Sequence, residues 1–142
     1  MLHAKWTPPQ NIHLTYLFLG EVKQPEKIIE KLQGIDYEQK DISLKGVGIF
    51  GKPPRILFTK ADDEAVIKLH KTIANRLNIS TQRAFVPHVT LARIKRIGEE
   101  KNFQETLEKY NTKHLGSMQL RLDLIQSELT PTGAKYTTLH RF

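Results

Sequence analysis

Two short segments of this chain share one residue pattern, and a similar order of predicted elements follows each of them. The segments are residues 11–17, NIHLTYL, and residues 86–92, VPHVTLA. Each is a β-type run in which a histidine and a threonine stand two positions apart. Such a repeat constrains the fold strongly, because duplicated units form equivalent structures that pack against each other.

The segment after each copy of the motif is predicted to be helical. After the first copy, Pro25 can occupy the first turn of a helix, where its missing N–H is harmless, and Gly34 can end that helix. After the second copy, Gly98 precedes a stretch with apolar residues at helical spacing, residues 103–110. Both halves therefore continue from a strand into a helix.

A third predicted helix, residues 63–77, joins the two halves. Asp62 or Asp63 can cap its N-terminus, and apolar residues at helical spacing form its buried face. His70 is expected to pack at the edge of that face. No Ser/Gly/Pro-rich linker separates the halves, which indicates one domain.

Each half ends in a long strand, a turn and a closing strand. The four strands are predicted at residues 42–50, 55–59, 118–129 and 135–142. We therefore expect a single α+β domain over residues 1–142, with lobes at roughly residues 11–60 and 86–142. Each lobe is an antiparallel sheet with helices on its outer face. A pseudo-two-fold axis relates the lobes, with an active-site cleft between them.

The repeated His-x-Thr motif carries the candidate chemistry. Because side chains alternate along a strand, His13 and Thr15 share one face, as do His88 and Thr90. A two-fold arrangement brings both pairs to one centre. There a neutral imidazole can accept a proton while a protonated one donates, and threonine hydroxyls can donate hydrogen bonds to phosphate oxygens. This pattern indicates displacement at phosphorus without a metal ion.

The charge and composition limit the partners and exclude several classes of site. The chain has 22 Lys and Arg against 15 Asp and Glu, a net charge of +7, which suits a phosphate-rich partner such as nucleic acid or simply a solvated surface. It has no cysteine, which excludes disulfides, thiolate zinc sites and iron–sulfur clusters. No motif for ATP, zinc or a nicotinamide cofactor is present, so we expect no cofactor. No apolar stretch is long enough for a membrane span, and we expect a cytoplasmic protein.

Three segments together resemble a known family. Residues 6–22, 87–93 and 127–136 are similar to the two-histidine (2H) phosphoesterase superfamily, and within it to RNA 2′,3′-cyclic phosphodiesterases, historically called 2′-5′ RNA ligases. The resemblance implies hydrolysis of a 2′,3′-cyclic phosphate at an RNA end to a 2′-phosphomonoester. It also implies reversible, ATP-independent joining of RNA ends through a 2′-5′ linkage.

The resemblance also implies roles for the motif residues and a class of substrate. His13 would be the proton donor and His88 the proton acceptor, with Thr15 and Thr90 holding the phosphate; the residue pattern alone leaves the direction open. The partner would be RNA with 2′,3′-cyclic phosphate ends, such as tRNA halves. Small cyclic nucleotides and 2′-5′-linked oligonucleotides are alternative substrates. A basic module of the same fold that binds RNA ends without turnover is the alternative function.

Four further residues are candidate substrate contacts. Arg93 occupies a family-like position, although strand alternation sets it on the face opposite Thr90, in solvent, unless a bulge or the strand end changes its direction. Arg55 comes directly after the turn that contains Pro53 and Pro54, and its side chain could reach substrate or face water. Phe50 and Trp6 could stack a nucleobase, or pack in the core.

Members of the family usually carry a further strand and helix before the first motif. The repeat shows no counterpart of these elements ahead of His13. We therefore expect the first lobe to expose a sheet edge and an apolar patch, and the chain to self-associate through that edge.

Overall fold

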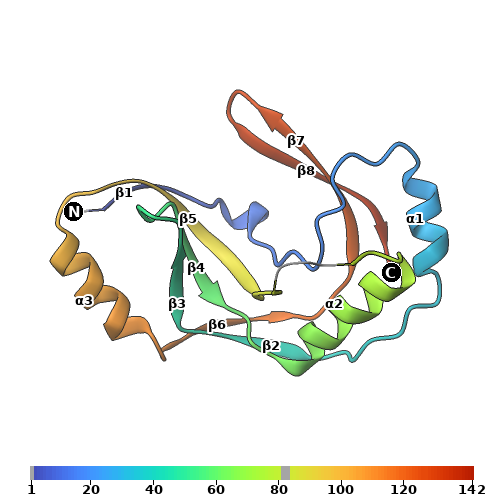
Figure 1. Ribbon diagram of the computed structural model, residues 1–142, viewed down its shortest axis with the longest axis horizontal. Helices are drawn as coiled ribbons and strands as arrows, with labels where there is room; N and C mark the ends of the chain where they lie inside the picture. The colour runs from blue at the N-terminus through green and yellow to red at the C-terminus, as the bar shows by residue number, and fades with distance from the viewer. Residues whose placement is uncertain (1, 81–83) are drawn as a thin grey trace.

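The computed structural model describes residues 2–80 and 84–142. The protein consists of antiparallel sheets and helices that pack together (Figure 1). This α+β architecture was predicted from the repeat. In chain order the elements are β1 (Leu2–Trp6), a 3₁₀ helix (Pro9–Asn11), α1 (Pro25–Leu32), β2 (Asp41–Lys45), β3 (Val47–Phe50), β4 (Ile56–Lys60), α2 (Glu64–Arg76), β5 (His88–Ile97), α3 (Glu100–Tyr110), β6 (His114–Gln119), β7 (Asp123–Thr130) and β8 (Gly133–Arg141). No helix in the described ranges is long and apolar enough to cross a membrane.

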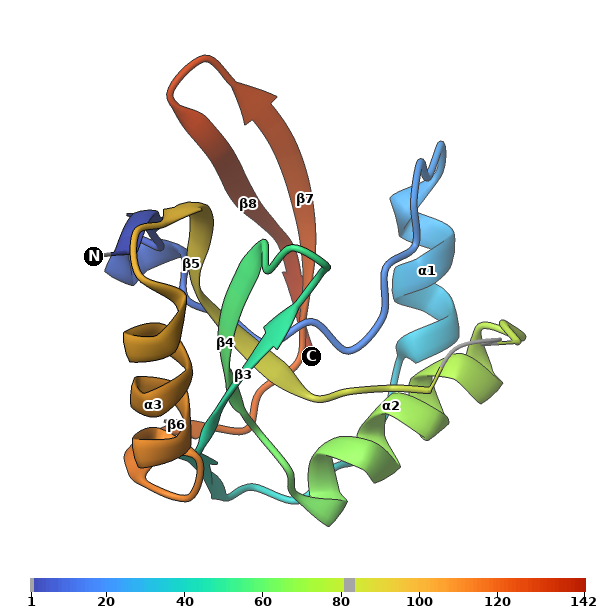
Figure 2. The same ribbon diagram turned by 60° about the vertical axis from the view of Figure 1, so that its left-hand side comes forward.

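A four-stranded sheet of order β1-β5-β4-β3 carries the second motif at the start of β5. Helix α3 covers one face of this sheet (Figure 2). The core on that side contains Leu57, Ala92 and Ile94 from the strands and is closed by Phe103 and Leu107 from α3. Because the apolar side chains point toward α3, the opposite face is left for His88 and its neighbours.

A second core lies where α1 and α2 pack, and it supports the first motif. Val66, Leu69 and Ile73 form the predicted stripe of α2, and all are buried. The carboxylate of Asp63 caps this helix by accepting a hydrogen bond from the Ala65 N–H at 2.8 Å. The three predicted helices are thus confirmed, with ends within a few residues of the expected positions.

Both long strands predicted from the sequence are broken in the structure. The first is divided at Gly46, which has φ of +80° and whose Cβ position would overlap the backbone carbonyl of Asn111. The chain turns there, so β2 pairs with β6 while β3 pairs with β4. The second is divided at residues 120–122, where Leu120 and Leu122 enter the core around α2. A single strand over residues 42–50 or 118–129 was therefore wrong.

The segment around the first motif is not a strand, contrary to the prediction. Residues 12–24 have no helix or ladder, and Leu14 makes an isolated antiparallel bridge with Val89. Leu14, Tyr16 and Leu17 pack on the α2 core, whereas Phe18 is 83% exposed. This segment has no ladder, and the packing of its side chains together with the bridge fixes its position instead.

The last two strands form a hairpin that projects from the body of the molecule (Figure 1). Within the described residues, β7 and β8 make a two-stranded sheet, and Leu129 near its turn is 93% exposed. Strand β1 precedes the first motif but pairs with β5. Self-association through an open edge of the first lobe stays a prediction.

Candidate active site

The two His-x-Thr motifs meet at their middle residues. Leu14 and Val89 are antiparallel bridge partners, which sets His13 across from Thr90 and Thr15 across from His88. Val89 is fully buried and Leu14 packs on the core around α2, so both point inward. Since side chains alternate along extended backbone, the histidines and threonines share the opposite face.

The pairing of equivalent residues supports the predicted two-fold relation. Strands β2 and β6, which follow α1 and α3, also pair antiparallel with Ser43 opposite Ser117. Equivalent segments that cross a two-fold axis must run antiparallel, as both of these pairs do. The sequence repeat thus has a counterpart in the fold.

Both histidines are held in the same way. The Nδ1 atom of His13 lies 2.6 Å from the carbonyl oxygen of Asn11, and that of His88 lies 2.7 Å from the carbonyl oxygen of Val86. A carbonyl only accepts, so each Nδ1 carries the proton and donates. Each Nε2 is therefore left to accept a proton when the ring is neutral and to donate one when it is charged.

Aromatic rings fix the orientation of each imidazole. Phe50 and Phe58 stack with centroids 4.2 Å apart, and both rings make T-shaped contacts with His88, at centroid distances of 4.9 and 5.3 Å. Tyr136 of β8 lies against His13 with a centroid distance of 4.9 Å. The sequence singled out Phe50 but missed Phe58 and Tyr136. The position of Phe58 in a strand of apolar residues gave no sign of this contact, whereas Tyr136 stood in the third family-like segment.

One buried histidine links the segments that carry the two motifs. His70 of α2 is 7% exposed, as expected, and its Nδ1 donates to the carbonyl oxygen of Tyr16 at 2.7 Å. Its ring stacks on Phe85, three residues before His88, with centroids 4.0 Å apart. Burial raises the pKa of Tyr16, whose hydroxyl stays protonated and donates to the carbonyl of Arg121 at 3.3 Å. These contacts fix the backbone beside Thr15 without touching the site itself.

A β-bulge changes the expected position of Arg93. In the pairing of β4 with β5, Phe58 lies opposite Thr90 and Leu57 lies opposite Ala92, so Leu91 is an extra residue. An extra residue reverses the alternation that follows it. Arg93 therefore lies on the same face as Thr90, and the placement expected from simple alternation was wrong.

The remaining sequence candidates lie elsewhere. The register sets Trp6 opposite Ala92, whose side chain is in the core beneath α3, so Trp6 points to the helix side of the sheet. Arg55 lines a surface pocket with Pro53, Ile94 and other residues near the start of α3. Of the four candidate substrate contacts, the structure brings Phe50 and Arg93 to the histidine face.

Comparisons with known proteins show the family to which this chain is similar. A family model described as the 2′-5′ RNA ligase superfamily matches residues 2–127. An RNA 2′,3′-cyclic phosphodiesterase of Aquifex aeolicus is 36% identical, with 98% of this chain and 81% of the relative covered. One of Archaeoglobus fulgidus is 33% identical, with 98% and 83% covered.

Solved structures show the same fold. The crystal structure of TT0787 of Thermus thermophilus superposes with a TM-score of 0.74 at 28% identity, covering 98% of this chain and 81% of that one. Escherichia coli LigT complexed with 3′-AMP also gives a TM-score of 0.74, at 20% identity, with 98% and 79% covered.

Proposed function

Because this chain belongs to the 2′-5′ RNA ligase superfamily, we propose that it is an RNA 2′,3′-cyclic phosphodiesterase that uses its two histidines as acid and base. The substrate is an RNA whose 3′ end carries a 2′,3′-cyclic phosphate, and the product is a 2′-phosphomonoester. The observation that carries the proposal is the equivalent setting of His13 and His88, each with Nδ1 held by a backbone carbonyl and Nε2 left for proton transfer.

In the proposed reaction, a water oxygen attacks phosphorus in line with the bond from phosphorus to the ribose O3′. Neutral His88 accepts a proton from the water at Nε2, and protonated His13 donates one from Nε2 to the leaving O3′. One P–O bond forms and one breaks, and the elements of water are added. These directions follow the family resemblance, because a pseudo-symmetric pair permits either assignment.

The threonines supply hydrogen bonds to the phosphate in this proposal. Thr15 and Thr90 lie on the same face as the histidines, where their hydroxyls can donate to the non-bridging oxygens as charge develops. Arg93 lies on this face because of the bulge, at the next position on the same face beyond Thr90, and adds a positive charge there. No metal ion takes part in the proposed steps.

With the 5′-hydroxyl of a second RNA in place of water, the same steps join two RNA ends. His88 then takes the proton from the attacking 5′-hydroxyl, and His13 again protonates the leaving O3′. ATP is not needed, because the bond broken in the cyclic phosphate is replaced by the new 2′-5′ linkage. The reverse steps, with the roles of the histidines exchanged, cleave that linkage. We propose this ligation as a secondary activity.

The deciding experiment follows an oligoribonucleotide with a 2′,3′-cyclic phosphate end by phosphorus NMR in the presence of EDTA. We expect the 2′-phosphate alone, and a 3′-phosphate product or a strict need for a divalent metal would refute the proposal. His13→Ala and His88→Ala should each lower turnover by roughly 10² to 10⁴, the usual scale for a general acid or base. His114→Ala, on the exposed surface of β6, is the matched control and should have wild-type turnover. Tight binding without turnover by the wild type would instead favour the RNA-end-binding module.

A further inference from the structure

A second β-bulge sets Arg96 of β5 on the histidine face, the same face as Arg93. In the pairing of β1 with β5, Ala4 lies opposite Ile94 and His3 lies opposite Arg96, so Lys95 is an extra residue. The guanidinium of Arg96 lies 2.9 Å from Nε2 of His3, which shows that these side chains share a face. Without the bulge, Arg96 would point toward α3.

The result is a row of cations that starts beside Thr90. Lys5 is the register partner of Arg93, and Arg96 follows Arg93 at the next site on the same face; we call Lys5, Arg93 and Arg96 the β1–β5 strip. Successive positions on one face are about 6.6 Å apart, since a strand rises about 3.3 Å per residue. Thr90, Arg93 and Arg96 therefore form an evenly spaced line that leads away from the histidines.

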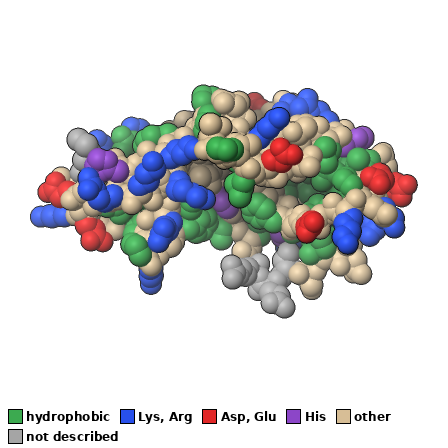
Figure 3. Space-filling model, turned by 90° about the horizontal axis from the view of Figure 1, so that it is seen from above, with side chains coloured by type: hydrophobic (Ala, Val, Ile, Leu, Met, Phe, Trp, Pro, Cys, Tyr) green, Lys and Arg blue, Asp and Glu red, His purple; other side chains and the backbone are tan. Residues whose placement is uncertain are grey.

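In the described part of the chain, no ion pair neutralises this strip. The four strands of the sheet contain Lys and Arg but no Asp or Glu. Within the described ranges 2–80 and 84–142, no carboxylate lies within 4.0 Å of a cationic nitrogen of the strip. Figure 3 shows Lys and Arg side chains gathered over the half of the upper face that holds this sheet.

An apolar row runs beside the cations on the same face. Ile56 of β4 is the register partner of Arg93, and Phe50 of β3 is the partner of Ile56. Both side chains are partly exposed. Proteins that bind single-stranded nucleic acid combine a positive track for the backbone with aromatic surfaces for the bases, and this face has both.

We propose that the β1–β5 strip binds the phosphates of single-stranded RNA on the 5′ side of the reacting end, which rests on the function proposed above. The reacting group is a 3′ end, so the rest of the RNA lies on its 5′ side and must leave the site in some direction. The strip gives that direction, with phosphates along Arg93 and Arg96 and bases toward Phe50. The enzyme thereby prefers an RNA strand to a cyclic mononucleotide.

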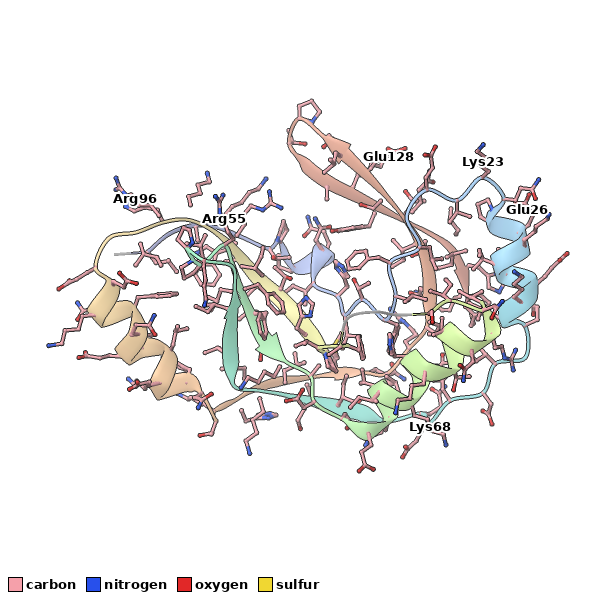
Figure 4. The ribbon with its side chains drawn as sticks, in the orientation of Figure 1. Lys23, Glu26, Arg55, Lys68, Arg96 and Glu128 are labelled. Carbon is pink, nitrogen blue, oxygen red and sulfur yellow. The ribbon has the colours of Figure 1, made fainter. Side chains whose placement is uncertain are left out.

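The test compares two double variants that remove the same charge. Lys5→Gln/Arg96→Gln removes the outer cations of the strip. Lys68→Gln/Lys71→Gln removes two exposed lysines of α2, which is the control because Lys68 points from the opposite side of the molecule to Arg96 (Figure 4). Binding of a short fluorescein-labelled single-stranded RNA is followed by anisotropy at several salt concentrations, with circular dichroism to show that each variant folds.

Each phosphate contact contributes a slope of about −0.7 to the dependence of log K on log salt for single strands. The strip variant should therefore have a slope shallower by about 1.4. Between about 50 and about 200 mM salt, the factor by which the affinity of the strip variant falls should be about sevenfold smaller than the factor for the wild type. The control variant should keep the wild-type slope. The affinity for a nucleoside 2′,3′-cyclic monophosphate, which has no 5′ phosphates, should change less than about twofold.

The inference is overturned if the strip variant and the control variant have the same slope, or if the cyclic mononucleotide loses as much affinity as the RNA. Equal binding of a blunt RNA duplex, with an equal loss in the strip variant, would overturn the single-strand assignment. If the wild type fails to hydrolyse the cyclic phosphate yet the slopes differ as stated, the enzymatic proposal falls and the RNA-binding strip stands.

Discussion

Replacing Gly48 by alanine should test whether the aromatic wall of the site positions His88. Gly48 faces the ring of Phe58, and a Cβ at this position would lie 2.5 Å from Cζ and 2.8 Å from Cε1 of that ring. Ordinary contact begins near 3.4 Å, so the ring would have to move by about 0.9 Å. Phe58 is 5% exposed and packs on Phe50 and His88, which leaves little space for this movement.

The expected effect on stability is a balance of two terms. Overpacking of this kind costs about 1–3 kcal/mol, and replacing a strand glycine by alanine recovers about 0.5–1 kcal/mol of chain entropy. Gly48→Ala should therefore lower the free energy of unfolding by up to about 2.5 kcal/mol, which chemical denaturation can measure. Because a displacement near 1 Å can cost about 100-fold in rate, kcat on the cyclic phosphate should fall by about 10- to 100-fold.

Gly116→Ala is the matched control. Gly116 also lies in a strand, β6, without a positive φ, and nothing lies within 4 Å of its Cβ position. This variant should be about 0.4–1 kcal/mol more stable than the wild type and equally active. Adding Phe58→Leu to Gly48→Ala should recover part of the loss, which a double-mutant cycle would detect. If Gly48→Ala were as stable and as active as the wild type, the wall of Phe50 and Phe58 would not position His88.

Three further variants test other parts of the structure. Asp63→Ala should lower the free energy of unfolding by about 1 kcal/mol through loss of the α2 cap. Partial burial disfavours the charged carboxylate, but hydrogen bonds from the α2 backbone and Lys40 hold the pKa of Asp63 below its usual range. The contribution of the cap is therefore present above about pH 4 and is lost as the pH falls through the pKa of the folded state. Urea titrations at pH 7 and pH 3 should show the cost of the variant shrinking in acid, and a constant cost would contradict this. His70→Leu should lower stability by about 1–3 kcal/mol, because it leaves the carbonyl of Tyr16 without its donor, and an unchanged melting curve would argue against that link. Thr90→Val should keep the fold but lower turnover by about 10- to 100-fold, since a hydrogen bond to the developing charge is lost; full activity would remove this threonine from the mechanism.

The sequence predicted the helices and the motif residues because their signals are local. Pro25 and Asp63 mark helix starts through their own backbone chemistry, and the stripe of α2 follows from helical periodicity. The repeated His-x-Thr pattern predicted that both pairs would meet, and the bridge of Leu14 with Val89 brings them together. No contact between distant residues had to be known for these predictions.

The errors arose where distant contacts decide the structure. The division at Gly46 depends on the carbonyl of Asn111, far along the chain, and the extra residue at Leu91 depends on pairing with β4. Simple alternation therefore sets Arg93 on the wrong face, and the bulge that corrects it could be named only as an exception. Phe58 and Tyr136 could not be identified from periodicity, because each contacts a histidine in another segment.

The single bridge at Leu14 gives the two halves of the site unequal resistance to hydrogen exchange. His88 belongs to β5 and is the register partner of Lys60 in the ladder with β4, so this part of β5 exchanges its amides when the sheet opens. The segment around His13 is joined to that sheet by one bridge and a few side-chain contacts, so it can open locally while β5 stays intact. His13 and His88 therefore lie in cooperative units of different stability, and the segment that carries His13 is the one expected to exchange its amide protons first.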